Sequence, residues 1–250
     1  MSETLQRAVR TLEALARAES DLSIRELADE VDVSKSAVQR LLSSLVESGL
    51  AMQDPVSRRY GLGPRTLVLG TAYQRRIDLR SIALPHLVHL RDLTGETVGL
   101  SVRVGDELLH VDQVESASAL RRSFEIGRTL PLWCGAPSRL FLADLPDAEV
   151  REILRRRRPS AVVPAAPPSA RRMAAAVREA RANGFAVAYG ETIAGVNTVS
   201  AGLSGADGRI AGTLSVTGPS TRWDAAAIGR WTPQLLETSG TVGALLGHRR

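Results

Sequence analysis

The stretch from Ser23 to Leu62, SIRELADEVDVSKSAVQRLLSSLVESGLAMQDPVSRRYGL, predicts two short helices followed by a β-hairpin. Ser23 precedes Glu26 by three residues, the spacing of a capping box, in which each side chain binds the other residue's backbone N–H at a helix start. Ser34 is placed to cap the second helix, and Gly49 to end it, because helices often close on a residue with positive φ. Apolar residues recur at helical spacing in between. The layout is typical of a winged helix-turn-helix.

The second predicted helix carries the side chains best suited to read DNA. Its exposed N-terminal face would enter the major groove. Gln39 can make a bidentate contact to adenine and Arg40 to guanine. Ser34, Lys35 and Ser36 lie at the helix start, where phosphates bind readily and fix the register without reading sequence. We therefore interpret this segment as a DNA-binding module.

Further candidates come from the wing and from a first helix predicted over residues 4–17. The candidate DNA contacts are Arg7, Arg10, Ser23, Ser34, Lys35, Ser36, Gln39, Arg40, Arg58, Arg59 and Tyr60. Two alternatives stay open: Arg40 and Arg59 are solvated or form local ion pairs, or the whole module is a protein-interaction winged helix.

Composition limits the classes of protein that fit. A chain of 250 residues favours two domains, and a net charge of +5 with a pI near 10.2 favours a polyanionic partner. Cys134 is the only cysteine, which excludes an intrachain disulfide. The N-terminus is amphipathic rather than signal-like, and no stretch is apolar enough to span a bilayer. We expect a cytoplasmic protein with no membrane partner.

The hydrophobic period divides the chain into three parts. Residues 1–63 form the winged helix-turn-helix domain, and 64–94 form a helical linker, with one helix from Arg65 to about Ile82 and another from Pro85 to Gly95. Residues 95–250 form an α+β domain, in which an antiparallel sheet is flanked by helices. Its predicted strands are 98–104, 107–114, 120–126, 185–189, 198–204 and 210–217, and its predicted helices are 136–144, 147–157, 172–183 and 224–246.

Residue patterns that would indicate an enzyme or a metal site are weak. The passage 202–205, Gly-Leu-Ser-Gly, lacks the last glycine of a nucleophile elbow and is better interpreted as a strand end. His86 and His89 lie three apart without a supporting carboxylate or cysteine, so surface or packing roles are favoured. Cys134 is interpreted as a buried apolar thiol, and His110 as a residue on one face of a strand. We expect no catalytic residue, metal or cofactor.

The chain resembles the IclR family of bacterial transcriptional regulators over nearly its whole length. The motifs occur in the family's order: the helix-turn-helix above, SRRYGLGP (57–64), LVLG (67–70), LRSIALPHLVHLRDLTGETVGLSV (79–102), Gly127 before Pro131-Leu132, GETIAGV (190–196) and LSVTGPSTRW (214–223). The resemblance implies an N-terminal winged helix, a helical linker and a C-terminal GAF-like domain that binds a small effector. It also implies homodimers or tetramers on double-stranded operator DNA.

The resemblance places an effector pocket on one face of the C-terminal sheet. Its carried-over lining residues are Leu132, Trp133, Ala188, Tyr189, Gly202, Ser215 and Thr217. Ser215 and Thr217 are two apart on a strand, so both hydroxyls face one side, where they can bind a carboxylate or hydroxyl of an organic acid or aromatic effector. The alternative is that these hydroxyls bond to nearby backbone.

Two passages depart from the family's pattern. Residues 135–139 read Gly-Ala-Pro-Ser-Arg where the family has Thr-Ala-x-Gly-Lys, and 200–202 read Ser-Ala-Gly where it has Ala-Ala-Pro. These changes favour an altered ligand or a degenerate pocket. We expect a transcription factor, repressor or activator, whose DNA binding responds to an effector. The alternatives are a ligand-independent architectural regulator and an enzyme in which the winged helix only mediates assembly.

Overall fold

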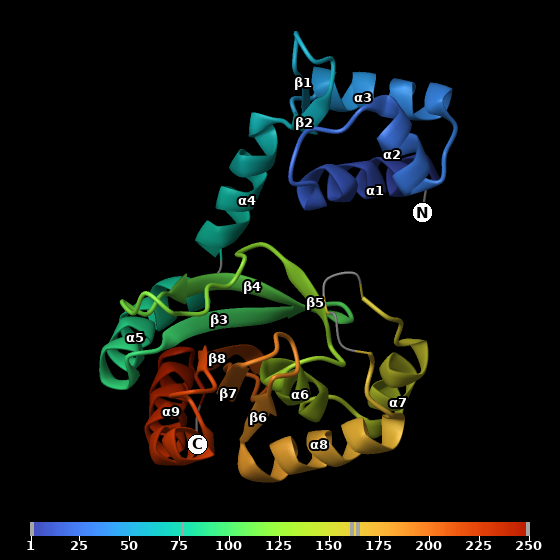
Figure 1. Cartoon of the computed structure of the whole chain (residues 1–250). Helices are drawn as coiled ribbons and strands as arrows, with labels where there is room; N and C mark the ends of the chain where they lie inside the picture. The colour runs from blue at the N-terminus through green and yellow to red at the C-terminus, as the bar shows by residue number, and fades with distance from the viewer. Residues whose placement is uncertain (1–2, 77, 161–162, 164–165, 249–250) are drawn as a thin grey trace. The chain divides into compact units, whose positions relative to one another are not determined.

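The computed structural model describes residues 3–76, 78–160, 163 and 166–248. The chain divides into two compact units, residues 1–77 and 78–250 (Figure 1). Over the described residues, no helix is both long enough and apolar enough to cross a membrane.

The first unit is a winged helix-turn-helix followed by one more helix. Its elements are α1 (Glu3–Arg17), α2 (Ile24–Val31), α3 (Lys35–Glu47), β1 (Ala51–Gln53), β2 (Tyr60–Leu62) and α4 (Pro64–Arg76). The capping box is confirmed, because Ser23 accepts from the Glu26 backbone and Glu26 accepts from the Ser23 backbone. Ser34 caps α3 as predicted, and Gly49 has a φ of 72° just after α3 ends.

The core of the first unit joins its three N-terminal helices to the β-hairpin. Leu27 of α2 and Val38 and Leu42 of α3 are fully buried, together with Leu15 of α1 and Tyr60 of β2. Between α2 and α3, Asp32 adopts a left-handed conformation with a φ of 53°, which an aspartate tolerates better than most residues. Asp32 thus ends α2 and begins the short turn into α3.

The second unit is built on a six-stranded antiparallel sheet in the order β5-β4-β3-β8-β7-β6. The strands are β3 (Thr97–Val104), β4 (Glu107–Val114), β5 (Thr129–Pro131), β6 (Phe185–Tyr189), β7 (Val196–Ser204) and β8 (Ile210–Pro219). The helices are α5 (Asp78–Thr94), α6 (Ala136–Ala143), α7 (Asp147–Arg156), α8 (Ala170–Asn183) and α9 (Ala225–Leu245). The predicted α+β class is therefore confirmed.

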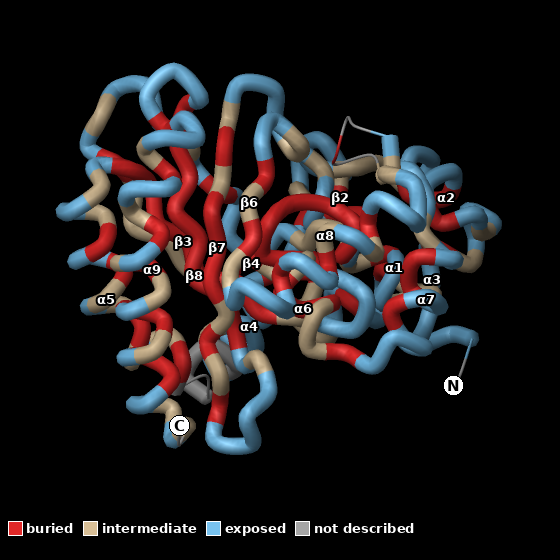
Figure 2. Tube along the Cα trace, turned by 90° about the horizontal axis from the view of Figure 1, so that it is seen from below, coloured by how far each residue is buried: buried red, intermediate tan, exposed pale blue. Residues whose placement is uncertain are grey.

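Helices cover both faces of this sheet. α5 and α9 pack beside each other against one face, and α6, backed by α8, packs against the other. Figure 2 shows the central strands β3, β7 and β8 buried along most of their length. The face under α5 is aliphatic, with Leu100, Leu214 and Val216. The face under α6 carries small polar residues, among them Ser101, Ser215 and Thr217, and that polar face forms the floor of the site described below.

Strand β4 contains a β-bulge at Val111. Leu100 of β3 pairs with Asp112 and Ser101 pairs with His110, so Val111 is one residue extra. The bulge reverses the alternation of side chains beyond it. As a result His110 faces α6, while Asp112 faces α5 and pairs with Arg80 at 2.8 Å.

Two sequence predictions are wrong in this unit. The first concerns the helix break: the helix predicted from Arg65 to about Ile82 ends at Arg76, and Pro85 does not begin a helix but lies inside α5. A continuous buried stripe of Leu79, Ala83, Leu87 and Leu90 holds α5 against the sheet on both sides of Pro85. Residues 120–126 do not form a strand. In place of a neighbouring strand, the side chains of Gln113, Thr97 and Arg222 bond to backbone groups of this segment.

Candidate functional site

The outer face of α3 is free to contact a ligand. Lys35, Gln39 and Arg40 are exposed, and within the described part of the chain their side chains make no hydrogen bond or ion pair. Ser34 and Ser36 are also exposed, with their hydroxyls 3.2 Å apart at the start of the helix. The residues predicted to read DNA therefore lie together on one helix face. The polar groups of Lys35, Gln39 and Arg40 have no partner among the described residues and can bind a ligand.

The wing holds its two arginines differently. Asp54 accepts hydrogen bonds from the backbone N–H groups of Val56 and Ser57, at 3.1 and 2.6 Å, which fixes the turn. Arg58, with a φ of 59°, is exposed at the tip without a described side-chain partner. Arg59 instead points back to α2, where it donates to Glu26 at 2.7 Å.

Glu26 joins the wing to the capping box. The Ser23 hydrogen bonds, followed by that of Arg59, hold the pKa of Glu26 at about 2. The open alternative that Arg59 forms a local ion pair is thus realised, whereas Arg40 forms none among the described residues. Ser23 and Arg59 therefore both bond to Glu26 within the first unit.

The other predicted contacts fall into two groups. Tyr60 is 4% exposed and belongs to the core of the first unit, so we remove it from the proposed DNA contacts. On α1, Arg7 pairs with Glu3, while Arg10 is exposed and makes no ion pair within the described residues. Arg10 keeps a free cationic side chain.

The second unit encloses a cavity of about 450 Å³. Thr198, Ser215 and Thr217 form its floor on β7 and β8. The walls come from β4, from residues 122–128, from the start of α6 at residues 135–137 and from the loop 191–193. The hydroxyls on this face pair across the strands, Thr198 with Thr217 at 3.0 Å and Ser200 with Ser215 at 2.7 Å. Among the described residues they have these side-chain partners and no backbone partner, in contrast to the alternative.

Arg122 is the most distinctive group in the cavity wall. It is half-buried, and its guanidinium lies 5.5 Å from the centre of the Phe124 ring. Burial, and secondarily the charge of Arg128, lower the pKa of Arg122. Arg128 pairs with Glu125, and Arg139 beside the cavity pairs with Glu191. Among the described residues Arg122 has no such acidic partner, so a desolvated cation faces the cavity.

His110 forms an uncharged part of the same wall. Its ring lies 4.6 Å from that of Phe124, and its Nδ1 is 2.9 Å from the Ser101 hydroxyl. Burial, reinforced by the charge of Arg122, lowers the pKa of His110 to about 4. The imidazole is therefore neutral at pH 7. It presents an aromatic surface to the cavity.

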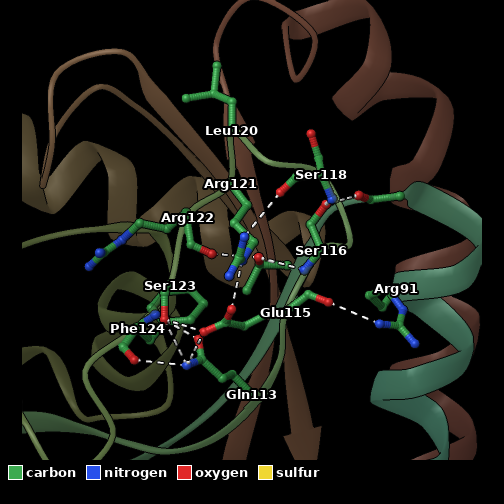
Figure 3. A network of polar contacts seen from close by, with 12 residues as sticks. Arg91, Gln113, Glu115, Ser116, Ser118, Leu120, Arg121, Arg122, Ser123 and Phe124 are labelled. Atoms are coloured by element: carbon green, nitrogen blue, oxygen red, sulfur yellow. Dashed lines mark hydrogen bonds and ion pairs between the residues drawn. The ribbon is translucent and has the colours of Figure 1, made fainter.

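Residues 115–124 are held over the sheet by a network of side chains (Figure 3). Gln113 donates to the Phe124 carbonyl at 2.9 Å and accepts from its N–H at 2.6 Å, as a neighbouring strand would. Thr97 donates to the Arg122 carbonyl at 2.5 Å. Figure 3 shows Arg121 turned toward Glu115, while Arg122 points away from this network. The segment thus has a fixed backbone although it is not a strand.

The predicted effector residues are divided among four places. Ala188, Ser215 and Thr217 line the main cavity. Trp133 and Tyr189 line a second cavity of about 310 Å³, which shares Cys134 and Glu191 with the first. Gly202 lines a different hollow near α9, and Leu132 is fully buried in the core. We therefore omit Gly202 and Leu132 from the proposed pocket.

The remaining candidates keep ordinary structural roles. Ser204 ends β7, as predicted for a strand end. His89 is exposed on α5, and burial raises the pKa of the Cys134 thiol to about 12. No three His, Cys, Asp or Glu side chains gather as a metal site in the described parts of the chain. His110, Arg122 and Phe124 were not predicted as cavity residues.

Comparison with known proteins decides the family. Residues 4–55 match the IclR helix-turn-helix domain, and residues 71–244 match the C-terminal domain of bacterial IclR transcriptional regulators. The chain belongs to the IclR family. The HTH-type transcriptional regulator BhcR of Paracoccus denitrificans is 27% identical over 246 residues, which span 98% of this chain and 88% of that protein.

Solved IclR structures share the fold over the whole chain. An IclR transcriptional regulator from Alicyclobacillus acidocaldarius matches with a TM-score of 0.84 and 26% identity, covering 99% of this chain and all 100% of that one. An IclR homologue from Microbacterium hydrocarbonoxydans, solved with 4-hydroxybenzoate, matches with a TM-score of 0.80 and 19% identity, covering 98% and 99%. This IclR-family protein is a DNA-binding transcriptional regulator with a C-terminal effector-binding domain.

Proposed function

We propose that α3 is the recognition helix and that Gln39 and Arg40 read bases in the major groove. The observation that carries this proposal is the row of exposed, unpaired polar side chains on α3. Ser34, Lys35 and Ser36 bind phosphate at the helix start, where backbone N–H groups favour anions. Arg58 at the wing tip, Arg10 and Arg7 add backbone contacts. Ser23 and Arg59 act indirectly, by fixing the wing to α2.

Operator binding gives the direct test. In a mobility shift with DNA upstream of the protein's own gene, Arg40→Ala is expected to weaken the specific complex about tenfold to a hundredfold, since a bidentate base contact is worth roughly 1–3 kcal/mol. Arg230→Ala on α9, which removes an exposed arginine of the second unit, serves as the matched control. Equal binding of the parent protein to operator and random DNA at moderate salt would contradict the proposal.

We infer that the regulator acts as a homodimer, or as a tetramer of paired dimers. Helix α4 exposes Leu67, Val68 and Leu69 at 73%, 64% and 56%, and α1 exposes Leu5 and Val9. Exposed apolar side chains of this kind support an interface between copies of the chain. Two-fold pairing would place two recognition helices on half-sites about 34 Å or a multiple apart. We keep residues 64–94 as the proposed linker between the domains, with boundaries at 63 and 94.

We propose that the effector is a small organic acid with an apolar or aromatic body. Arg122 supplies a half-buried cation that makes no ion pair among the described residues, the floor supplies hydroxyls, and His110 and Phe124 supply aromatic surface. A cavity of about 450 Å³ suits a small molecule. The Microbacterium homologue solved with 4-hydroxybenzoate supports an aromatic acid.

Thermal shift with carboxylic acids tests this assignment. A panel that includes 4-hydroxybenzoate is compared with the neutral 4-hydroxybenzyl alcohol, and an acid present at about 100 times its Kd adds about 2.7 kcal/mol. Arg122→Gln is expected to weaken binding about tenfold, as for a lost charged hydrogen bond. Arg121→Gln, which removes the neighbouring arginine bound to Glu115, is expected to leave binding unchanged. A panel without any response would favour the ligand-independent architectural regulator.

The regulator is proposed to have no catalytic activity of its own and to work in the cytoplasm. Its relatives are named as transcriptional regulators. The enzyme alternative predicts turnover of a bound acid, which incubation of the protein with the stabilising compound and analysis of the products would reveal.

A further inference from the structure

Positive charge in this chain is concentrated away from the helix-turn-helix. Residues 1–77 hold 11 basic and 10 acidic residues. Residues 151–181 hold nine arginines and two glutamates, a net charge of +7 in a chain whose total is +5. The excess of positive charge, which attracts polyanions at long range, therefore lies in the second unit, on and between α7 and α8.

The two helices form an antiparallel pair that brings these arginines together. Arg157, at the end of α7, donates to the carbonyl of Pro168 just before α8, at 3.1 Å. At the other end, Arg181 of α8 pairs with Asp147 at the start of α7, at 3.0 Å. The end of α7 thus lies beside the start of α8. In the sequence, Arg158 follows Arg157 directly, and Arg171 and Arg172 come three and four residues after Pro168.

The arginines face outward because the opposite sides of both helices are buried. α7 buries Val150, Ile153 and Leu154, and α8 buries Met173, Val177 and Ala180. Five arginines are exposed and make no ion pair within the described residues, and we name this set the basic surface: Arg151, Arg158, Arg171, Arg172 and Arg178. Arg155 and Arg156 lie next to it but are paired with Glu152.

The placement of two of these residues works against local helix stability. Arg171 and Arg172 occupy the first turn of α8, which contains no acidic residue. The positive end of a helix dipole repels cations by roughly 0.3–1 kcal/mol each. The same two charges become favourable when an anion binds there, because backbone N–H groups and guanidinium groups then act on it together.

We propose that the basic surface binds the phosphate backbone of duplex DNA, as a second and sequence-independent DNA contact of this regulator. Arginine pairs geometrically with phosphate, and DNA is the polyanion to which this family of regulators binds. The contact supplies non-specific affinity that the first unit, with a net charge of +1, supplies only weakly.

Salt-dependent binding of the full chain to a random-sequence 60-base-pair duplex tests the proposal. The slope of log affinity against log salt is expected to become shallower by about 0.9 for each lost phosphate contact. Arg178→Gln should show this change. In the triple variant Arg151→Gln, Arg171→Gln and Arg178→Gln, the slope should become shallower by up to roughly 2.7. Arg230→Gln, also exposed, helical and without an ion pair among described residues, is the matched control and should keep the parent slope.

Three results would overturn the proposal. The first is a slope of the triple variant equal to that of the parent, with unchanged tryptophan fluorescence showing that both are folded. The second is an equal loss in Arg230→Gln and Arg178→Gln. The third is displacement of the duplex by polyglutamate at lower charge concentration than by unlabelled duplex, which would assign the surface to an acidic protein.

The test is separable from that of the recognition helix. The basic surface contributes equally to operator and random DNA, so its loss should leave the ratio of the two affinities unchanged. Arg40→Ala should lower that ratio. A normal ratio in Arg40→Ala would contradict the recognition-helix assignment and leave the basic surface intact.

Discussion

Replacing Arg222 by leucine is expected to lower the free energy of unfolding of the second unit by about 3 kcal/mol, because it leaves a buried carboxylate without its cation. Glu96 is only 3% exposed, and Arg222 contacts both of its oxygens. The Glu96 carboxyl fills the space that Gly218 leaves free: a Cβ there would be 2.6 Å from it. Arg222 also donates to the Leu120 carbonyl at 2.7 Å, so the variant should loosen residues 115–124 as well.

Urea unfolding followed by tryptophan fluorescence measures this effect selectively, since Trp133, Trp223 and Trp231 all lie in the second unit. Arg155→Leu is the matched control, because its pair with Glu152 is exposed and such pairs contribute about 0–1 kcal/mol. Adding Glu96→Gln to Arg222→Leu should recover part of the loss, since no charge then remains buried. Equal destabilisation by Arg222→Leu and Arg155→Leu would refute the argument.

Acidification is expected to remove about 3 kcal/mol of stability through His110 alone. The pKa of His110 falls from 6.5 to about 4 in the folded state, so the unfolded chain binds the proton first. Stability is therefore unaffected by this group above pH 6.5, decreases as pH falls from 6.5 to 4, and is constant below that. A difference of about 2.5 pKa units corresponds to about 3 kcal/mol.

The contribution of His110 is isolated by subtracting two pH profiles. Unfolding free energies of the parent protein and of His110→Gln are measured between pH 4 and 8, so that the titration of carboxyl groups common to both cancels. The difference should change by about 3 kcal/mol over the window. His89→Gln removes an exposed imidazole from α5 and should leave the parent profile unchanged over the same range. Parallel profiles for the parent and His110→Gln would show that the buried imidazole is not the cause.

The first unit could be predicted closely from sequence because its signals are local. A capping box, an N-cap serine and a closing glycine each depend on a few consecutive residues, and all three are present where expected. The exposure of Gln39 and Arg40 follows from their spacing relative to the buried Val38 and Leu42. The exceptions are long-range. Tyr60 is buried by residues of α1–α3, and Arg59 forms an ion pair with Glu26, 33 positions earlier.

The cavity could be predicted only in part, because its wall depends on side-chain contacts between distant segments. Ser215 and Thr217 follow from strand alternation. The segment 115–126 does not, because Gln113, Thr97 and Arg222 supply hydrogen bonds to its backbone that a strand partner would otherwise provide. Leu120, Phe124 and Ile126 alternate as in a strand, whereas the serines at 116, 118 and 123 are typical of a loop. Arg122 was missed for this reason.

Val111, the unpaired residue of β4, also determines where this strand tolerates a one-residue deletion. Excision of Val111 would leave Leu100 opposite Asp112 and Ser101 opposite His110, so every side chain of the strand would keep its present side. Excision of a residue elsewhere within β4 would reverse the sides over part of the strand. The bulge is therefore the point in β4 at which evolution can lose one codon while α5 and the cavity retain the same neighbours.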